Sequence, residues 1–373
     1  MKNKIFIEFL ESELNKLSRK KDINHTLMLV KSTDNSFCWK NTYGESLSTD
    51  TPFWIASITK MFISSIVLLL MEEGKLTLND QIIRYLPEKL IKDVHVINGI
   101  DYFDQLTIHH LLKHASGIPD YLEIKQNKKS IIDEVIEKDD MAWGINEILK
   151  IVKNSGKPHF EPQDISKPKY RIRYSDTNYQ LLIAIIESIT DLSIEDAYEK
   201  YIINPLGMKN TFLPHGKNHK EKQITFPWIG QVEFSNKPKA LKSFNDLYST
   251  LDDLVIFMES IIDDKVFKDK NAKNMMMSSW QTFDFGVSLL APGWPIQYGS
   301  GMMKVEIPRL FTWFKKTPSF IGHTGATGSW LFYCKKLKLI LCGTVDQVTK
   351  APVPFNIVPK ILRKYNKMIS SLN

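Results

Sequence analysis

FWIASITKMF, residues 53–62, places a serine and a lysine three positions apart, directly ahead of the apolar run FISSIVLLLMEEGK (62–75). Since residues i and i+3 share one face of a helix, we expect the Lys60 ammonium group about one turn from the Ser57 hydroxyl group. A helix start with a solvated lysine would show the same S-x-x-K pattern, which chance often supplies. The pair therefore indicates a reactive serine only if other parts of the chain support it.

Three other stretches carry residues suited to a polar site. YSDTNY (174–179) has a tyrosine followed two positions later by an acid, just ahead of a helical pattern. HTGATG (323–328) is polar and glycine-rich inside an apolar strand pattern, where a missing side chain permits close approach of the backbone. LLKHASGIPDY (111–121) is a turn-rich segment. Because these stretches occur in the same chain as SITK, they support the interpretation of Ser57 and Lys60 as part of a reactive site.

In this order, SITK, YSD and HTG resemble the S-x-x-K, Tyr-x-Asn and Lys/His-Thr-Gly motifs of the penicillin-recognising serine hydrolases. That family includes class C β-lactamases, D-alanyl-D-alanine carboxypeptidases, D-aminopeptidases and related esterases. Supporting stretches are GKLTLND (74–80), LLKHASGIPDY, NPLGMKNTFL (204–213) and YSTLDDLVIF (248–257). The resemblance runs from about Trp54 to Thr344, and an ordered set of motifs is far more specific than any one of them.

Strand patterns gather at the two ends of the chain and helical patterns in the middle. HTLMLVKSTDNSFCWKN (25–41) and FIGHTGATGSWLFYCKKLKLILCGTVDQ (320–347) are hairpin-like, and DFGVSLLA (284–291) is a further strand candidate. We predict an α/β (α+β) fold of the β-lactamase/transpeptidase type, with an antiparallel sheet flanked by N- and C-terminal helices and a large, mostly helical insertion. The expected domains are residues 1–80 with 241–373 for the sheet, and 81–240 for the insertion, with the ligand cleft between them.

The resemblance implies that Ser57 is the nucleophile, at a helix N-terminus whose dipole favours the developing alkoxide. A serine hydroxyl needs a base, and Lys60 and Tyr174 are the candidates. A nearby cation lowers the pKa of a phenol, and a desolvated lysine loses its proton more readily. We expect the two to act as a coupled pair, with activity rising on the alkaline side of neutrality, and the sequence leaves open which one takes the proton.

The resemblance also implies an oxyanion hole made by the backbone N–H groups of Ser57 and Ala326. His323, Thr324 and Gly325 would line the strand along which a substrate lies.

Two residues depart from the family pattern. Asp176 stands where Asn is common, so it accepts hydrogen bonds but donates none when ionised, although it can still hold Lys60. His323 replaces the lysine usual in class C β-lactamases, which makes any attraction of a carboxylate dependent on pH. Both changes favour an esterase or peptidase over an efficient β-lactamase.

We therefore predict a serine hydrolase that forms an acyl-enzyme on Ser57 with small esters, amides or D-amino-acid peptides. A β-lactam is a candidate covalent ligand. One alternative is a β-lactamase or a penicillin-binding carboxypeptidase or transpeptidase. Another alternative is a catalytically inactive binding module that keeps the fold. Two features favour it: Asp176, and the basic segment that leads to the tyrosine motif, FEPQDISKPKYRIRYSD (160–176).

No metal or organic cofactor is implied. HHLLKH places His110 and His114 four positions apart, but the glutamate of H-E-x-x-H is absent and no third ligand is suggested. We expect His114 to belong to a turn or core contact.

The charge pattern argues against a nucleic-acid partner. The formal net charge is +7, but the basic residues are scattered and form no stripe with aromatic residues. The longest apolar stretch, around residues 61–71, falls short of the roughly 20 residues of a membrane span, so none is expected. The sequence carries no prediction of the oligomeric state.

Localisation follows from the N-terminus and the cysteines. Glu8, Glu11 and Glu13 interrupt the apolar region that a signal peptide would need, which indicates an amphipathic helix. The three cysteines form no CxxC pair and fit a reducing compartment. We expect a cytoplasmic protein, or an exported one if a leader was trimmed ahead of Met1.

Overall fold

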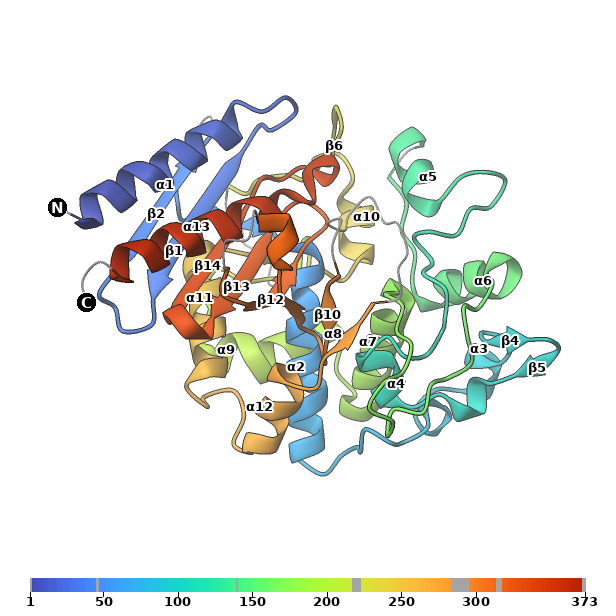
Figure 1. Cartoon of the computed structure of the whole chain (residues 1–373). Coiled ribbons are helices and arrows are strands. Elements are labelled where there is room, and N and C mark those ends of the chain that lie inside the picture. Colours follow the sequence, from blue (N-terminus) through green and yellow to red (C-terminus); the bar gives the residue numbers. More distant parts are fainter. Residues whose placement is uncertain are drawn as a thin grey trace.

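The structure, a computed structural model, describes residues 2–44, 47–138, 140–216, 223–283, 295–312 and 317–370. Within these residues, eight strands form one antiparallel sheet in the order β2-β1-β14-β13-β12-β11-β10-β9 (Figure 1). The strands are β1 (Thr26–Ser32), β2 (Cys38–Tyr43), β9 (Gln281–Thr282), β10 (Gln297–Tyr298), β11 (Met303–Val305), β12 (Phe320–Thr324), β13 (Trp330–Cys334) and β14 (Leu339–Thr344).

Two hairpins build one half of this sheet, from the edge strand β2 to β13. β1 pairs with β2, and β13 pairs with β14 across the Lys335–Leu337 turn, as the sequence predicts. β1 then pairs antiparallel with β14, with Leu29 opposite Cys342. The two ends of the chain therefore meet in one sheet, which confirms the predicted fold class. The strand expected at 284–291 lies outside the described residues.

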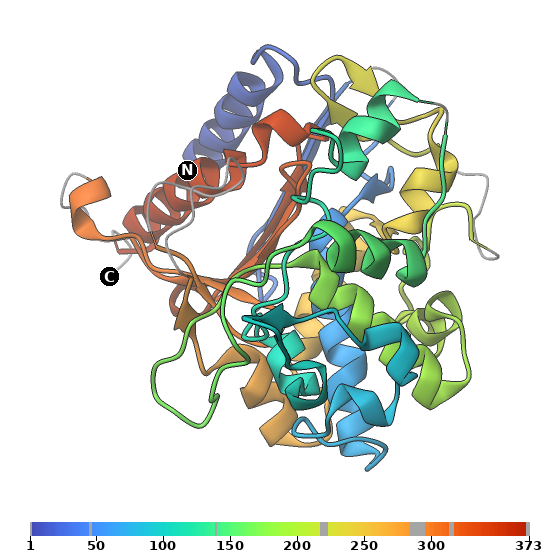
Figure 2. The same ribbon diagram turned by 90° about the vertical axis from the view of Figure 1, so that its right-hand side faces the viewer.

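Helices α1 (Lys2–Ser18) and α13 (Val353–Ser370) lie side by side over one face of the sheet (Figures 1 and 2). Both present an apolar stripe, and the rings of Phe6 and Tyr365 pack between them at 5.3 Å. Phe6, Phe332 and Val358 belong to one buried cluster, which joins the helices to the sheet. The predicted N- and C-terminal flanking helices are confirmed.

The other face of the sheet carries α2 (Thr59–Glu72), α11 (Leu251–Ile262) and the remaining helical part of the chain (Figure 2). The other helices are α3 (Glu88–Ile91), α4 (Ile108–Leu112), α5 (Ile131–Glu137), α6 (Ile145–Ser155), α7 (Asp176–Thr190), α8 (Ile194–Tyr198), α9 (Asn204–Leu206), α10 (Pro238–Ser243) and α12 (Lys270–Met277). Three short antiparallel pairs complete the fold: β3 (Phe53–Trp54) with β8 (Tyr248–Ser249), β4 (Val96–Ile97) with β5 (Ile100–Asp101), and β6 (Trp228–Ile229) with β7 (Val232–Glu233).

One large buried cluster joins the sheet to the helical part. It includes Ile66 on α2, Ile185 on α7 and Cys342 on β14. Since α2 packs against α7, the core continues across residue 80, and the domain boundaries expected there and at residue 240 stay a prediction. None of the helices in the described part of the chain is both long and apolar enough to cross a bilayer.

Candidate active site

Ser57 lies in a 3₁₀ turn, Ala56–Ile58, that leads directly into α2. Ala56 has a left-handed φ of 46°, which is unfavourable for a residue with a Cβ atom and is held by the surrounding bonds. The Ile55 N–H donates to the Leu247 carbonyl at 3.0 Å, and the Ser329 hydroxyl donates to the Ile55 carbonyl at 3.0 Å. Both bonds hold Ile55, the residue directly ahead of the turn, and Ser57 precedes the α-helix proper, which begins at Thr59.

The glycine of HTG allows the end of β12 to approach this turn. A Cβ atom on Gly325 would lie 2.5 Å from the Ile55 carbonyl oxygen and 3.0 Å from the Ala56 Cβ. Any side chain there would push the strand away from the serine turn. The close backbone approach expected from HTGATG is confirmed, and it brings Ala326 to the cavity that Ser57 lines.

Lys60 reaches back along α2 to Ser57. Its Nζ donates to the Ser57 Oγ at 3.0 Å and forms an ion pair with the Asp176 carboxylate. The same nitrogen lies 5.1 Å from the centre of the Tyr174 ring. The structure therefore brings together Ser57, Lys60, Tyr174 and Asp176, four residues that the sequence singled out from two distant stretches.

The surroundings of Lys60 keep it charged. Burial opposes the ammonium form, but the negative charge of Asp176, with smaller contributions from Tyr174 and Asp246, outweighs it and raises the pKa of Lys60 well above its ordinary value. Burial also raises the pKa of Tyr174, helped by Asp176 and opposed by Lys60 and Ser57. The expected lowering of the phenol pKa by the lysine is thus present but is outweighed by desolvation.

His114 accepts hydrogen bonds from the two residues that flank Tyr174 in the sequence. Its carbonyl oxygen accepts from the Arg173 N–H at 2.9 Å, and its Nδ1 accepts from the Ser175 N–H at 3.2 Å. The His114 and Tyr174 ring centres are 4.5 Å apart. Burial lowers the pKa of His114 well below its ordinary value, so the ring is neutral and Nδ1 stays an acceptor. The expected core contact of His114 is therefore a contact of the site itself.

The other histidine of the HHLLKH stretch, His110, caps helix α4. His110 Nδ1 accepts from the Thr107 N–H at 3.0 Å in a capping box of α4, and its Nε2 lies 2.7 Å from the Gln163 carbonyl oxygen. Among the described residues, no group of three or more His, Cys, Asp or Glu side chains is arranged to hold a metal ion.

His323 does not lie where the sequence placed it. Its ring is fully buried, with Nδ1 donating to the Thr324 carbonyl at 2.6 Å and Nε2 3.3 Å from the Tyr298 hydroxyl. Burial, with a smaller effect of Lys60, lowers its pKa to about 3. Thr324, Gly325 and Ala326 line the cavity beside Ser57, whereas His323 is absent from its lining. The expected pH-dependent attraction of a carboxylate has no support in this geometry, because a neutral, enclosed ring supplies no cation.

A cavity of about 690 Å³ opens beside Ser57. Its lining is largely apolar, with Trp54, Tyr121 and Phe244 among the aromatic side chains. It also holds three acids that sequence reasoning missed, Asp120, Glu123 and Asp246. Asp120 lies within the quoted GIPDY stretch, which could have drawn attention to it, whereas nothing in the sequence around Asp246 indicates a site.

The described lining of this cavity contains more acidic than basic side chains. Each cation of the described lining already has a partner: Lys60 pairs with Asp176, and Arg173 pairs with Glu123 at 3.3 Å. Burial raises the pKa of Asp246 to about 7 and, with the charge of Asp176, raises the pKa of Asp120 well above its ordinary value. The arrangement suits a neutral or cationic ligand better than one with a free carboxylate.

Comparison with known proteins places these features in a wider group. The Beta-lactamase family model matches residues 33–353. A relative from Escherichia coli (strain K12), described as a putative D-alanyl-D-alanine carboxypeptidase, is 25% identical over 361 residues, which cover 84% of this chain and 76% of the relative. A relative of the same description from Salmonella agona (strain SL483) is 26% identical over 314 residues, covering 76% of this chain and 66% of its own length.

Solved structures share the fold. The D-amino acid amidase of Ochrobactrum anthropi SV3, in complex with L-phenylalanine, superposes with a TM-score of 0.73 over 99% of this chain and 98% of its own, at 18% identity. The octameric penicillin-binding protein homologue of Pyrococcus abyssi gives a TM-score of 0.72 over 97% of this chain and 77% of its own, at 22% identity. At these identities, the likeness concerns the arrangement of the backbone.

Proposed function

Because the chain belongs to the beta-lactamase family, we propose that it is a serine hydrolase that forms an acyl-enzyme on Ser57. The observation that carries this proposal is the 3.0 Å hydrogen bond from the Lys60 Nζ to the Ser57 Oγ at the wall of a cavity of about 690 Å³. A solvated lysine would not be 2% exposed or sit between a serine, a tyrosine and a carboxylate. The arrangement also weighs against an inactive binding module, which has no need of this combination.

The proposed reaction starts from the form of the enzyme in which the Tyr174/Lys60 pair has lost one proton. The Ser57 Oγ attacks the carbonyl carbon of an ester or amide, and the serine proton passes to this pair. The backbone N–H groups of Ser57 and Ala326 stabilise the oxyanion. The pair returns the proton to the leaving alcohol or amine as the C–O or C–N bond breaks, and the acyl group stays on Ser57. Water then attacks this ester and gives a proton to the same pair, which returns the proton to the Ser57 Oγ as the C–O bond to Ser57 breaks and the acid leaves.

The charge of the cavity supports small esters, amides or D-amino-acid peptides as substrates. A neutral acyl group fits the apolar lining, and an ammonium group on the substrate would stabilise the ionised forms of Asp120 and Asp246. The fold-level likeness to a D-amino acid amidase points to the same substrate class.

A β-lactamase or a penicillin-binding carboxypeptidase is the second candidate. The names of the Escherichia coli and Salmonella agona relatives favour it. The buried, neutral His323 speaks against it, because both kinds of substrate carry a carboxylate and the described lining offers no unpaired cation to bind it.

The test is turnover of p-nitrophenyl acetate, D-phenylalanine amide, nitrocefin and an acyl-D-alanyl-D-alanine peptide by wild type and Ser57→Ala. We expect hydrolysis of the ester or the amide that is lost in Ser57→Ala. Turnover of nitrocefin or the peptide as the best substrate would favour the second candidate. Wild-type rates in Ser57→Ala for every substrate would contradict the mechanism.

A further inference from the structure

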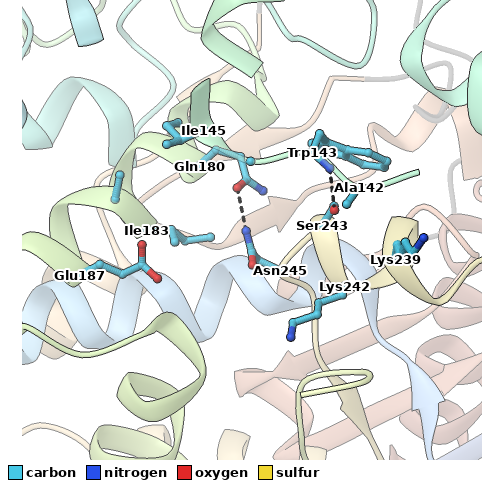
Figure 3. A pocket seen from close by; sticks show the side chains of 12 residues that line it. Ala142, Trp143, Ile145, Gln180, Ile183, Glu187, Lys239, Lys242, Ser243 and Asn245 are labelled. Atoms are coloured by element: carbon cyan, nitrogen blue, oxygen red, sulfur yellow. Dashed lines mark hydrogen bonds between the residues drawn. The ribbon is translucent and has the colours of Figure 1, made fainter. Parts of the chain in front are cut away.

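A second cavity of about 390 Å³, whose lining side chains are drawn in Figure 3, adjoins the cavity beside Ser57. It is formed by the segment that precedes α6, by α7 and by the α10 region. Its lining residues are Ala142, Trp143, Gly144, Ile145, Gln180, Ile183, Ala184, Glu187, Lys239, Lys242, Ser243 and Asn245. Gln180 and Ile183 line both cavities, so the two spaces are neighbours that share one wall.

The wall is a thin partition made by residues 244–246 and two side chains of α7. Along this segment, Phe244 and Asp246 line the cavity beside Ser57, whereas Asn245 lines the second cavity. The Phe244 ring is held between two indoles, 5.3 Å from Trp54 on the one side and 5.1 Å from Trp143 on the other. Phe244 lines the first cavity and Trp143 lines the second, so the contact between these two rings separates the two spaces at this point.

Gln180 closes the rest of the partition. Its Nε2 donates to the Phe244 carbonyl at 3.0 Å, and its Oε1 accepts from the Asn245 Nδ2 at 3.0 Å, a bond visible in Figure 3. Both ends of the amide are therefore bonded to the segment 244–246 rather than turned toward a ligand. Gln180 is only 8% exposed, which leaves its side chain little freedom to move out of the wall.

We propose that Gln180 and Phe244 set the upper length of the acyl group that fits beside Ser57, and that the second cavity is the space that opens when either side chain is removed. This inference rests on the proposed function. The substrate class that follows is short acyl groups for the natural chain. Long, linear acyl groups would be accepted only when the partition is open, because Trp143, Ile145 and Ala184 then extend the apolar lining.

The experiment compares kcat/KM for p-nitrophenyl acetate, butyrate, octanoate and decanoate in wild type, Gln180→Ala and Phe244→Ala. In wild type, we expect kcat/KM to fall at the long chains. Both variants should raise the decanoate-to-acetate ratio by at least about tenfold, the discrimination that a single methylene group reaches in a hydrophobic pocket. Lys242→Ala, on the exposed rim of the second cavity only, is the matched control and should keep the wild-type ratio.

Equal loss of activity on all esters in both wall variants, or an unchanged ratio, would overturn the proposal. A crystal structure of Gln180→Ala provides a readout that needs no turnover: the two cavities should be continuous, and two separate cavities would also contradict it. Failure of the proposed function has a different signature, namely acetate turnover that does not depend on Ser57.

Discussion

The Lys60 ammonium nitrogen lies 3.0 Å from the Ser57 hydroxyl oxygen, while the same nitrogen forms an ion pair with Asp176. The lysine is therefore shared between the serine that we propose as nucleophile and a carboxylate where the family commonly has an amide. This sharing governs how easily a proton can leave Ser57, because every negative group around Lys60 stabilises its charged form.

Removing either member of the Tyr174/Lys60 pair should strongly reduce turnover. We expect Lys60→Ala and Tyr174→Phe each to lower kcat by about 10²- to 10⁴-fold, the usual contribution of a positioned acid or base. Steady-state kinetics with the best ester or amide measures this. Lys75 and Tyr201 form a comparable exposed pair, with the Lys75 Nζ 3.3 Å from the Tyr201 hydroxyl, so Lys75→Ala and Tyr201→Phe are matched controls. Near-wild-type rates in both site variants would exclude this base.

Asp176→Asn should move the pH–rate profile toward lower pH. Asp176 raises the pKa values of both Lys60 and Tyr174, so its neutral replacement lowers both, and the deprotonated form needed for catalysis appears at lower pH. The measurement is kcat/KM against pH for wild type and variant. Asp252→Asn, which removes one of the two carboxylate partners of Lys40 on the surface, should leave the pH–rate profile unchanged. A shift of the rising limb toward higher pH contradicts this electrostatic account.

His114 should act as a positioning residue for Tyr174. His114→Ala removes the acceptor of the Ser175 N–H, and we expect kcat to fall about 10- to 100-fold with a smaller change in KM, as misplacement of a reacting group does. His114→Asn keeps an acceptor and tolerates the left-handed φ of 55°, so it should restore most of kcat. The kcat and KM values of both variants measure this. If the kcat values of His114→Ala and His114→Asn changed only in step with their melting temperatures, the role of His114 would be structural only.

Local patterns were enough to predict part of this site. The spacing of Ser57 and Lys60 on one helix face follows from helix geometry, and the glycine of HTG indicated the close backbone approach. Tyr174 could be assigned only through the resemblance, because its distance from Ser57 is set by tertiary packing. Of the fold, the two hairpins and the flanking helices followed from periodicity.

The errors have a physical origin too. Successive side chains of a strand point to opposite faces, so Thr324 lines the cavity, whereas the His323 ring is fully buried with its centre 6.3 Å from that of the Tyr174 ring. The position of Asp246 in the cavity and the hydrogen bonds from residues 173 and 175 to His114 depend on long-range contacts. No local sequence pattern encodes such contacts. The pKa of Tyr174 was misjudged because the sequence shows the neighbouring cation but not the desolvation that outweighs it.

Asp346 should make the free energy of unfolding depend on pH. Burial, opposed by hydrogen bonds from Thr225 and Thr344, raises its pKa to about 7. Since the folded state then binds more protons than the unfolded state, the stability that the neutral acid supports is present below its ordinary pKa and is lost as the pH rises toward about 7.

Asp346→Asn should remove this loss and stabilise the protein at neutral and higher pH, by up to a few kcal/mol, since one pKa unit corresponds to about 1.4 kcal/mol. Asparagine also tolerates the left-handed φ of 47°. Urea denaturation at several pH values measures the effect, with Asp104→Asn as an exposed control. Equal stability differences between wild type and Asp346→Asn at acidic and neutral pH would show that Asp346 has no such linkage.

The most direct test of the central claim is the intact mass of wild type and Ser57→Ala after incubation with a fluorophosphonate probe and, in parallel, with a penicillin. We predict a single fluorophosphonate adduct on wild type that is absent from Ser57→Ala, with slower labelling by the penicillin. An adduct of equal extent on both proteins, or none on wild type with either reagent, would contradict an activated serine at position 57.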